Sequence, residues 1–165
     1  MQFTHLSKYL QRLEETTKRL EMTAILTEMI KDLDIKEVDI AIYLSLGYLN
    51  APFNSLKFNI AEKMMARILM ETFQKSDKDI DTEYAKEGDM GTVFYNLCKN
   101  SSSDISILEV HRLLTEIAKT EGSGSQEAKI NKTADLLRKV DGLSGKYIVR
   151  TVLGTTRLGF TELTI

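Results

Sequence analysis

The chain has 165 residues, 42% of them hydrophobic and 28% charged, which excludes a disordered or collagen-like chain and fits one domain with a buried core. The formal net charge of −2 lacks the basic excess that most nucleic-acid-binding domains carry. The single cysteine, Cys98, excludes an internal disulfide and a cysteine-based zinc cluster, and one proline and nine glycines are few for an all-β fold.

The first predicted element is a long amphipathic helix over residues 3–20. Its apolar residues recur at steps of three, four, three and seven, as on one helical face: Phe3, Leu6, Leu10, Leu13 and Leu20. A second helical pattern covers residues 25–33, and IKEVDIAIYLSLG predicts a third helix that ends at Gly47. Charges near the amino terminus exclude a secretory signal, and no apolar run is long enough for a membrane span, so an intracellular protein is expected.

The middle of the chain combines an apolar helix with a polar segment. After Pro52, apolar residues form two helical rows, which predicts a helix buried over a wide face: Ile60, Met64 and Ile68, with Met65, Leu69 and Phe73. Residues 74–89, QKSDKDIDTEYAKEGD, are predicted to form an exposed acidic connection. Their alternating aspartates lack the glycine and the closing glutamate of a calcium loop, so we expect no metal there.

Three more helices are predicted before residue 142. The stretch DMGTVFYNLCK indicates a short one, and Ser106 with Glu109 has the S-x-x-E form of a capping box that starts the next. That helix leads into the glycine-containing turn of KTEGSGSQEAK, where Ser123 or Ser125 is expected to cap the following helix. The following helix is predicted to end near Gly142.

The stretch SGKYIVRTVLG is rich in β-branched residues but has the spacing of a helix that ends at Gly154. No other stretch predicts a strand convincingly. We therefore predict an all-α fold, a compact multi-helix domain that covers residues 1–165.

The word KVDG at residues 139–142 matches the K-x-D-G signature around the nucleotide-accepting lysine of nucleotidyl transferases. Such a lysine needs further carboxylates and lysines on a large, mostly β domain. The few residues after Lys139 predict helix and loop instead, so we expect Lys139 to end a helix, where the helix dipole favours a cation. His5 and His111 are read as ordinary helix residues, and no catalytic residue is assigned.

Glycine-containing, mildly basic turns are the better candidate site. Backbone amides at a helix amino terminus suit phosphate oxygens where no Cβ obstructs them, and nearby cations can add neutralising charge: Lys129, Lys146, Arg150 and Arg157. From residue 121 onward, seven Lys and Arg outnumber five Asp and Glu, so an anionic partner is expected at the carboxy-terminal part. Ordinary helix–helix loops with solvated charges remain the alternative.

Several stretches, in order, extend this reading: FTHLSKYLQRLEETTKRLEMTAILTEMI, GYLNAPF, FNIAEKMMARIL, GDMGTVF, SILEVHRLLTEIAKTEGSGSQEAKI and LLRKVDGLSGKYIVRTVLGTTRLGFTELTI. Together they resemble the amino-terminal DNA-binding domain of ATP-dependent DNA ligases of the archaeal and eukaryotic type. The resemblance implies an all-helical domain that grips nicked duplex DNA through the minor groove and backbone, largely regardless of sequence. It also implies that adenylation and OB-fold domains, with ATP and magnesium, belong to the longer parent enzyme, and that this chain is a monomeric fragment without a cofactor.

The resemblance places the DNA-facing residues in two turns: Gly122, Ser123, Gly124, Ser125 and Lys129 in the first, and Thr156, Arg157, Leu158 and Gly159 in the second. Arg150 is expected either to contact DNA or to anchor one turn against the other. Two departures, Thr155-Thr156 where a lysine often stands and Ser144-Gly145 where a glutamate-alanine pair is frequent, imply weak DNA affinity. The alternative function is a helical protein-interaction module without DNA affinity.

Overall fold

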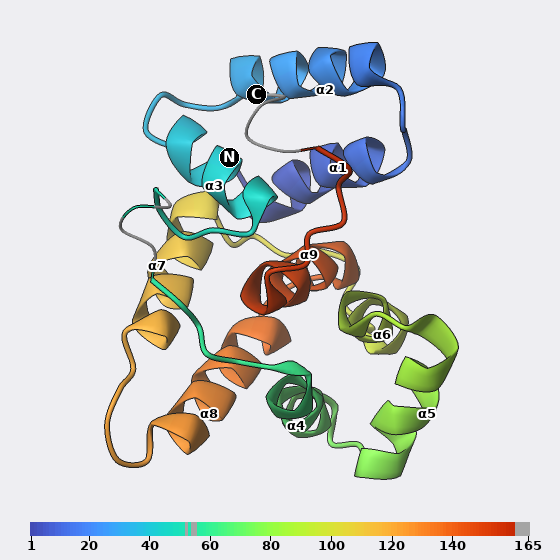
Figure 1. Cartoon of the computed structure of the whole chain (residues 1–165), viewed down its shortest axis with the longest axis vertical. Helices are drawn as coiled ribbons and strands as arrows, with labels where there is room; N and C mark the ends of the chain where they lie inside the picture. Colours follow the sequence, from blue (N-terminus) through green and yellow to red (C-terminus); the bar gives the residue numbers. More distant parts are fainter. Residues whose placement is uncertain (52, 54–55, 161–165) are drawn as a thin grey trace.

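The computed structural model describes residues 1–51, 53 and 56–160, and this part of the chain is all-α (Figure 1). Its helices are α1 (Phe3–Glu14), α2 (Arg19–Asp32), α3 (Val38–Leu46), α4 (Glu62–Phe73), α5 (Asp77–Glu87), α6 (Met90–Leu97), α7 (Ile107–Ala118), α8 (Ser125–Arg138) and α9 (Gly142–Leu153). Within the described ranges the β-structure is one isolated bridge, between Gln2 and Ser106. The predicted fold class is confirmed.

Helix α9 forms the centre of the molecule, with α1, α6 and α8 around it (Figure 1). Its residues are buried nearly all round, including Tyr147, Ile148, Val149 and Val152, as expected of a helix that neighbours cover on every side. Gly154 ends α9 in the left-handed conformation with φ of 70°, which confirms the predicted helix and its end. No described helix has both the length and the apolar character needed to cross a bilayer.

Helices α6 and α9 cross at two glycines. A Cβ on Gly91 would lie 2.7 Å from the Lys146 carbonyl oxygen, and a Cβ on Gly145 would lie 1.9 Å from Phe94 Cε1. Phe94 is fully buried and its ring centroid lies 5.1 Å from that of Phe73. The glycines therefore allow the two helices to approach closely, and the sequence departure at Ser144-Gly145 belongs to this buried contact.

The predicted helix over residues 3–20 is two helices. Helix α1 ends at Glu14 and α2 begins at Arg19, so Leu20 does not continue the apolar face and is 87% exposed. Between them the Lys18 backbone N–H donates to Thr16 Oγ1 at 3.2 Å. Threonine offers the backbone this local alternative to helical hydrogen bonding, and the chain turns there.

The acidic segment 74–89 is exposed along most of its length but contains a helix, α5, where a connection was predicted. Ser76 Oγ accepts from the Asp79 N–H and the Asp79 carboxylate accepts from the Ser76 N–H, which makes a reciprocal capping box. Ile80 is the fully buried residue of this helix, and Gly88 ends it with φ of 64°. Aspartates near the helix start are favoured by the helix dipole, so the acidic pattern marks a helix amino terminus.

Helix starts are confirmed in part. Ser106 Oγ accepts from the Glu109 N–H at 3.1 Å, but the Glu109 carboxylate pairs with Arg112, so the predicted box is half formed. Helix α8 begins at Ser125 with Gly124 at its N-cap in the left-handed conformation and no side-chain cap. The prediction of a serine cap was therefore wrong, because the glycine supplies the required backbone conformation.

Candidate functional site

The segment of residues 154–160, called here the C-terminal turn, has an unusual backbone. Gly154 and Gly159 have φ of 70° and 72°, and Arg157 between them has φ of 58°. Glycine adopts this left-handed region freely, whereas an arginine there costs conformational energy that the surroundings must offset. Backbone outliers of this kind are frequent at functional sites, so Arg157 is a candidate functional residue.

The C-terminal turn lies against the ends of other helices. Arg157 Nη2 donates to the Gly88 carbonyl at 3.1 Å, at the junction of α5 and α6. A Cβ on Gly47, the residue that ends α3, would lie 3.3 Å from Thr156 Cγ2. Figure 1 shows the segment leaving α9 and passing toward α1 and α2. The Arg157 side chain is 52% exposed, so its guanidinium can reach a ligand from solvent.

A buried charge network lies beneath this turn. Arg150 is 3% exposed and donates from Nε and Nη2 to Asp89 Oδ2 at 3.0 and 2.7 Å. Its Nη1 lies 3.0 Å from Glu14 Oε2 as an ion pair without hydrogen-bond geometry. Glu14 also accepts from the Tyr147 hydroxyl at 2.6 Å. Arg150 thus ties α9 to α1 and to the start of α6, and these side-chain contacts do not join the two predicted turns to each other.

The network shifts the pKa values of its carboxyl groups. Burial alone would raise the pKa of Asp89, but hydrogen bonds from Arg150 and Thr92 and the Arg150 charge outweigh it, and the pKa is lowered. The pKa of Glu14 is lowered likewise, because donation from Tyr147 and Lys146 outweighs its desolvation. Burial and the bond to Glu14 raise the pKa of Tyr147, so its hydroxyl stays protonated and donates.

These shifts predict acid sensitivity. The folded-state pKa values of Asp89 and Glu14 lie below their unfolded values. Their stabilisation is therefore complete above the unfolded pKa and is lost as the pH falls below about 4 toward the folded pKa. Urea unfolding followed between about pH 7 and about pH 3 should show this loss, and Glu14→Gln should show a smaller one. Equal acid sensitivity of the two proteins would contradict a role for Glu14.

The predicted first turn joins α7 to α8. Gly122 and Gly124 have φ of 92° and 76°, and nothing lies within 4 Å of a Cβ built on either. These glycines are therefore needed for backbone conformation, not for close packing within the domain. Gly122, Ser123 and Gly124 are exposed and Ser125 is half-buried. The uncapped amino terminus of α8 leaves backbone N–H groups available to an anion, although Glu127 stands in the same first turn.

Two predicted DNA-facing side chains do not face solvent. Lys129 is 6% exposed, and its ammonium donates to the Phe58 carbonyl at 2.7 Å. It thus fastens α8 to the segment before α4, because a buried ammonium requires a hydrogen-bond partner. Leu158 is buried in the hydrophobic core. Both side chains are therefore buried within the domain, where the sequence analysis expected them to face DNA.

The two turns do not form one contiguous site. In Figure 1 the α7–α8 connection lies at the lower left edge, whereas the C-terminal turn leaves α9 at the centre of the molecule. Helix α8 extends between these regions.

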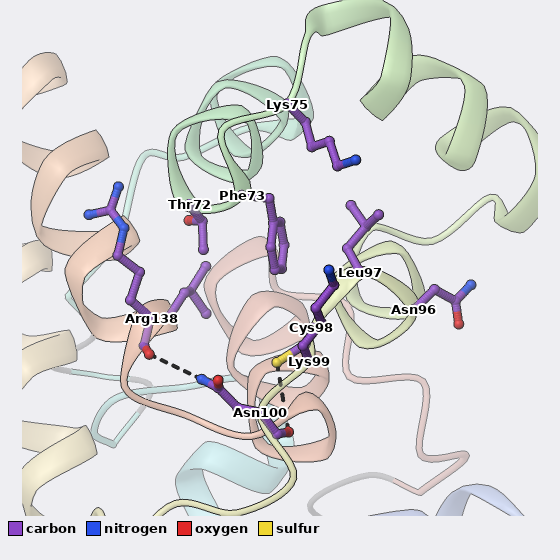
Figure 2. A pocket seen from close by; sticks show the side chains of 10 residues that line it. Thr72, Phe73, Lys75, Asn96, Leu97, Cys98, Lys99, Asn100 and Arg138 are labelled. Carbon is purple, nitrogen blue, oxygen red and sulfur yellow. Dashed lines mark hydrogen bonds between the residues drawn. The ribbon is translucent and has the colours of Figure 1, made fainter.

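A pocket of about 490 Å³ lies where α4, α6 and α8 end. Figure 2 shows Phe73 among the lining residues, with Lys75, Lys99 and Arg138 around it. Asn100 Nδ2 donates to the carbonyls of Arg138 and Val140 at 3.2 and 3.1 Å. Cations and amide donors are expected beside three helix carboxyl ends, so helix capping accounts for this lining. Since α6 begins at the Asp89 network and ends here, this pocket and the C-terminal turn lie at opposite ends of α6.

The KVDG motif at residues 139–142 forms the junction between α8 and α9. Lys139 is the exposed C-cap of α8, and Asp141 is the buried N-cap of α9. Asp141 accepts from the Ser144 N–H at 3.0 Å and from the Ser103 hydroxyl at 3.0 Å. These roles explain the lysine, the aspartate and the following glycine without nucleotidyl chemistry. Among the described residues, no group of His, Cys, Asp and Glu is arranged to hold a metal.

Sequence reasoning missed Asp89 and Glu14. The available signal was Gly88-Asp89, a helix-ending glycine followed by a helix-capping aspartate, directly before the predicted short helix. This pair locates a tight junction but does not reveal that Arg150 and Arg157 lie against it.

Comparison with known proteins gives consistent matches along the chain. A family model described as DNA ligase N terminus matches residues 2–165. A probable DNA ligase of Dictyoglomus thermophilum is 34% identical over 165 residues, covering 100% of this chain and 28% of that protein. DNA ligase 1 of Methanosarcina mazei is 36% identical over 162 residues, which cover 98% of this chain and 28% of that protein. A DNA ligase of Sulfolobus acidocaldarius is 32% identical over 179 residues, 100% of this chain and 30% of its own. The chain thus spans less than a third of these relatives.

Proposed function

Because this chain belongs to the family of DNA ligase N-terminal domains, we propose that it binds nicked duplex DNA, regardless of base sequence, on behalf of a longer ATP-dependent ligase. The observation that carries this proposal is the half-exposed Arg157, held in a left-handed turn between glycines. Residues 1–165 then form one DNA-binding domain that performs no covalent step.

The chemistry of the C-terminal turn suits a phosphodiester backbone. An arginine guanidinium donates paired hydrogen bonds to phosphate oxygens, and glycines let backbone amides approach the same group. Contacts of this kind position a protein on DNA without reading its sequence. The proposed contacts are the exposed or half-buried members of the two turns: Gly122, Ser123, Gly124, Ser125, Thr156, Arg157 and Gly159. Lys129, Arg150 and Leu158 are buried and are not among the proposed contacts.

In the parent enzyme, other domains would supply ATP, magnesium and the nucleophilic lysine. The chain represents 28% to 30% of its relatives, which leaves room for adenylation and OB-fold domains. The proposed contribution of this domain is to hold the two ends of a nick in place. Positioning of reactants can lower a barrier by several kcal/mol without contact with the reacting atoms. The proposed roles in replication and repair follow from this nick-joining reaction.

Salt titration of DNA binding tests the proposal. Fluorescence anisotropy with a nicked and an intact duplex should show log K falling by about 0.9 per contacted phosphate for each decade of salt. Arg157→Ala should weaken binding about tenfold on unrelated sequences alike and reduce the slope by about 0.9.

Arg112→Ala is a matched control, because Arg112 is an exposed arginine on α7 that pairs with Glu109 and Glu116. It should leave affinity and slope unchanged. A wild-type chain without DNA affinity at low salt would favour the protein-interaction module instead. A changed base preference in Arg157→Ala would show that this contact is misassigned, and equal affinity for both duplexes would remove the preference for nicks.

A further inference from the structure

We propose that Asp89 is a positioning residue for the DNA-binding arginine: its carboxylate holds Arg157 in the orientation that meets a phosphate. This inference rests on the function proposed above. It identifies the contact that orients Arg157, in the C-terminal turn, for binding a phosphate. It concerns a residue that contacts Arg157 and not the DNA itself.

The two oxygens of Asp89 have different partners. Oδ2 accepts from the Thr92 N–H at 3.0 Å and the Thr92 hydroxyl at 2.7 Å. The same oxygen accepts from Arg150 Nε and Nη2 at 3.0 and 2.7 Å. Oδ1 lies on the side of Arg157, 3.9 Å from its Nε. One oxygen is thus committed to the fold, and the other faces the exposed arginine.

Asp89 cannot easily rotate away from this arrangement. It is 6% exposed and is the N-cap of α6, so its backbone is fixed by the first turn of that helix. Arg150 holds its carboxylate from the buried side, and Glu14 in turn holds Arg150. A side chain locked by such supporting hydrogen bonds gives a fixed reference point for the group it orients.

The Arg157 side chain lies against Gly88 and Asp89 at two places. Its Nη2 donates to the carbonyl of Gly88, and its Nε faces the carboxylate of the next residue, Asp89. These contacts restrict a long, flexible side chain before any ligand arrives, so less rotamer entropy is lost when a phosphate binds. They also help to offset the cost of the left-handed backbone at Arg157.

The charge balance favours positioning over competition with phosphate. The 3.9 Å separation of Asp89 Oδ1 and Arg157 Nε is too long for a hydrogen bond. Arg150 largely neutralises the negative charge of Asp89, because its Nη2 lies only 2.7 Å from Asp89 Oδ2. A phosphate that offers direct hydrogen bonds can therefore engage Arg157 without first breaking a strong ion pair.

A double-mutant cycle tests the proposal with the chain of residues 1–165 and a nicked duplex as the probe. Asp89→Asn keeps the shape and the helix-capping oxygen but removes the charge, and should weaken binding about threefold. In the Arg157→Ala background the same substitution should have no further effect, since its action passes through Arg157. An equal loss in both backgrounds would overturn the proposal, as would tighter binding by Asp89→Asn, which would indicate competition.

Asp141→Asn is the matched structural control. Asp141 is also a buried N-cap aspartate with several donors on its carboxylate, but those donors come from Ser103 and Ser144. It should lower the melting temperature as Asp89→Asn does while leaving DNA affinity unchanged. A loss of affinity in Asp141→Asn that matches the loss in Asp89→Asn would show that general destabilisation explains both.

Arg157→Lys provides a second test that does not require Asp89→Asn to fold. Lysine keeps the charge but cannot face Gly88 and Asp89 with a planar fork. Positioning predicts that Arg157→Lys binds nearly as weakly as Arg157→Ala, whereas affinity equal to wild type would refute it. If the wild-type chain does not bind the nicked duplex at low salt, the proposed function fails. If wild type binds and Arg157→Ala binds equally well, DNA binding stands, but the proposed contact of Arg157 and this inference both fail. If Arg157→Ala weakens binding but Asp89→Asn and Arg157→Lys do not, the inference alone fails.

Discussion

Arg150→Ala is expected to lower the free energy of unfolding by about 3 to 5 kcal/mol, the usual cost of removing one partner from a buried ion pair. The substitution leaves the buried Asp89 carboxylate without its two arginine hydrogen bonds and removes the cation beside Glu14. Urea or guanidinium unfolding followed by circular dichroism at neutral pH measures the loss.

Arg138→Ala is the matched control for this substitution. Arg138 also pairs with two carboxylates, Asp135 and Glu71, but its side chain is more exposed. It should cost less than about 1 kcal/mol. The deficit of Arg150→Ala should also shrink below about pH 4, where protonation neutralises the stranded carboxylates. A loss for Arg150→Ala as small as that for Arg138→Ala would show that the network contributes little to stability.

Gly145→Ala is expected to lower the free energy of unfolding by about 2 to 3 kcal/mol and the melting temperature by about 5 to 10 °C. Alanine favours a helix over glycine by about 1 kcal/mol, so propensity alone predicts the opposite sign. Steric overlap should win, because the added Cβ would lie 1.9 Å from Phe94 Cε1 in a fully packed core. Differential scanning calorimetry gives the sign directly.

Gly142→Ala is the control on the same helix. A Cβ there would lie 3.4 Å from Tyr95 Cδ2, close to ordinary contact, so the variant should be near neutral. Phe94→Leu should recover part of the stability lost by Gly145→Ala, because a smaller side chain leaves space for the new methyl group. A stabilised Gly145→Ala, or no recovery in the double variant, would mean that α6 and α9 shift apart at little cost.

The sequence predicted helices best where apolar periodicity determines which face of the helix is buried. The rows around Ile68 and Leu69 and the spacing of Ile148 and Val152 lead to buried faces on α4 and α9. Prediction failed where local hydrogen bonds decide. The chain turns at Thr16 between α1 and α2 despite an apolar pattern that continues to Leu20, and Ser76 caps the start of α5 in a segment with little apolar signal.

The candidate site was predictable only in its backbone. Glycines mark left-handed turns, and the chain uses Gly122, Gly124, Gly154 and Gly159 in that way. The partners of the basic residues were not predictable, because they come from distant parts of the chain. Arg150 meets Asp89 across 61 positions, and Lys129 meets Phe58 across 71. Whether a cation is exposed or buried depends on such long-range contacts, which no local spacing encodes.

The close fit of Gly145 against Phe94 ties the two crossing helices together in any recombination of related sequences. A relative with alanine at this position is expected to carry a smaller or differently placed residue where this chain has Phe94, since a Cβ on Gly145 would lie 1.9 Å from Phe94 Cε1. A chimera that exchanges α9 alone would bring two incompatible surfaces into one core. Crossover points in such chimeras should therefore fall outside the interval from α6 to α9, so that both helices come from the same parent sequence.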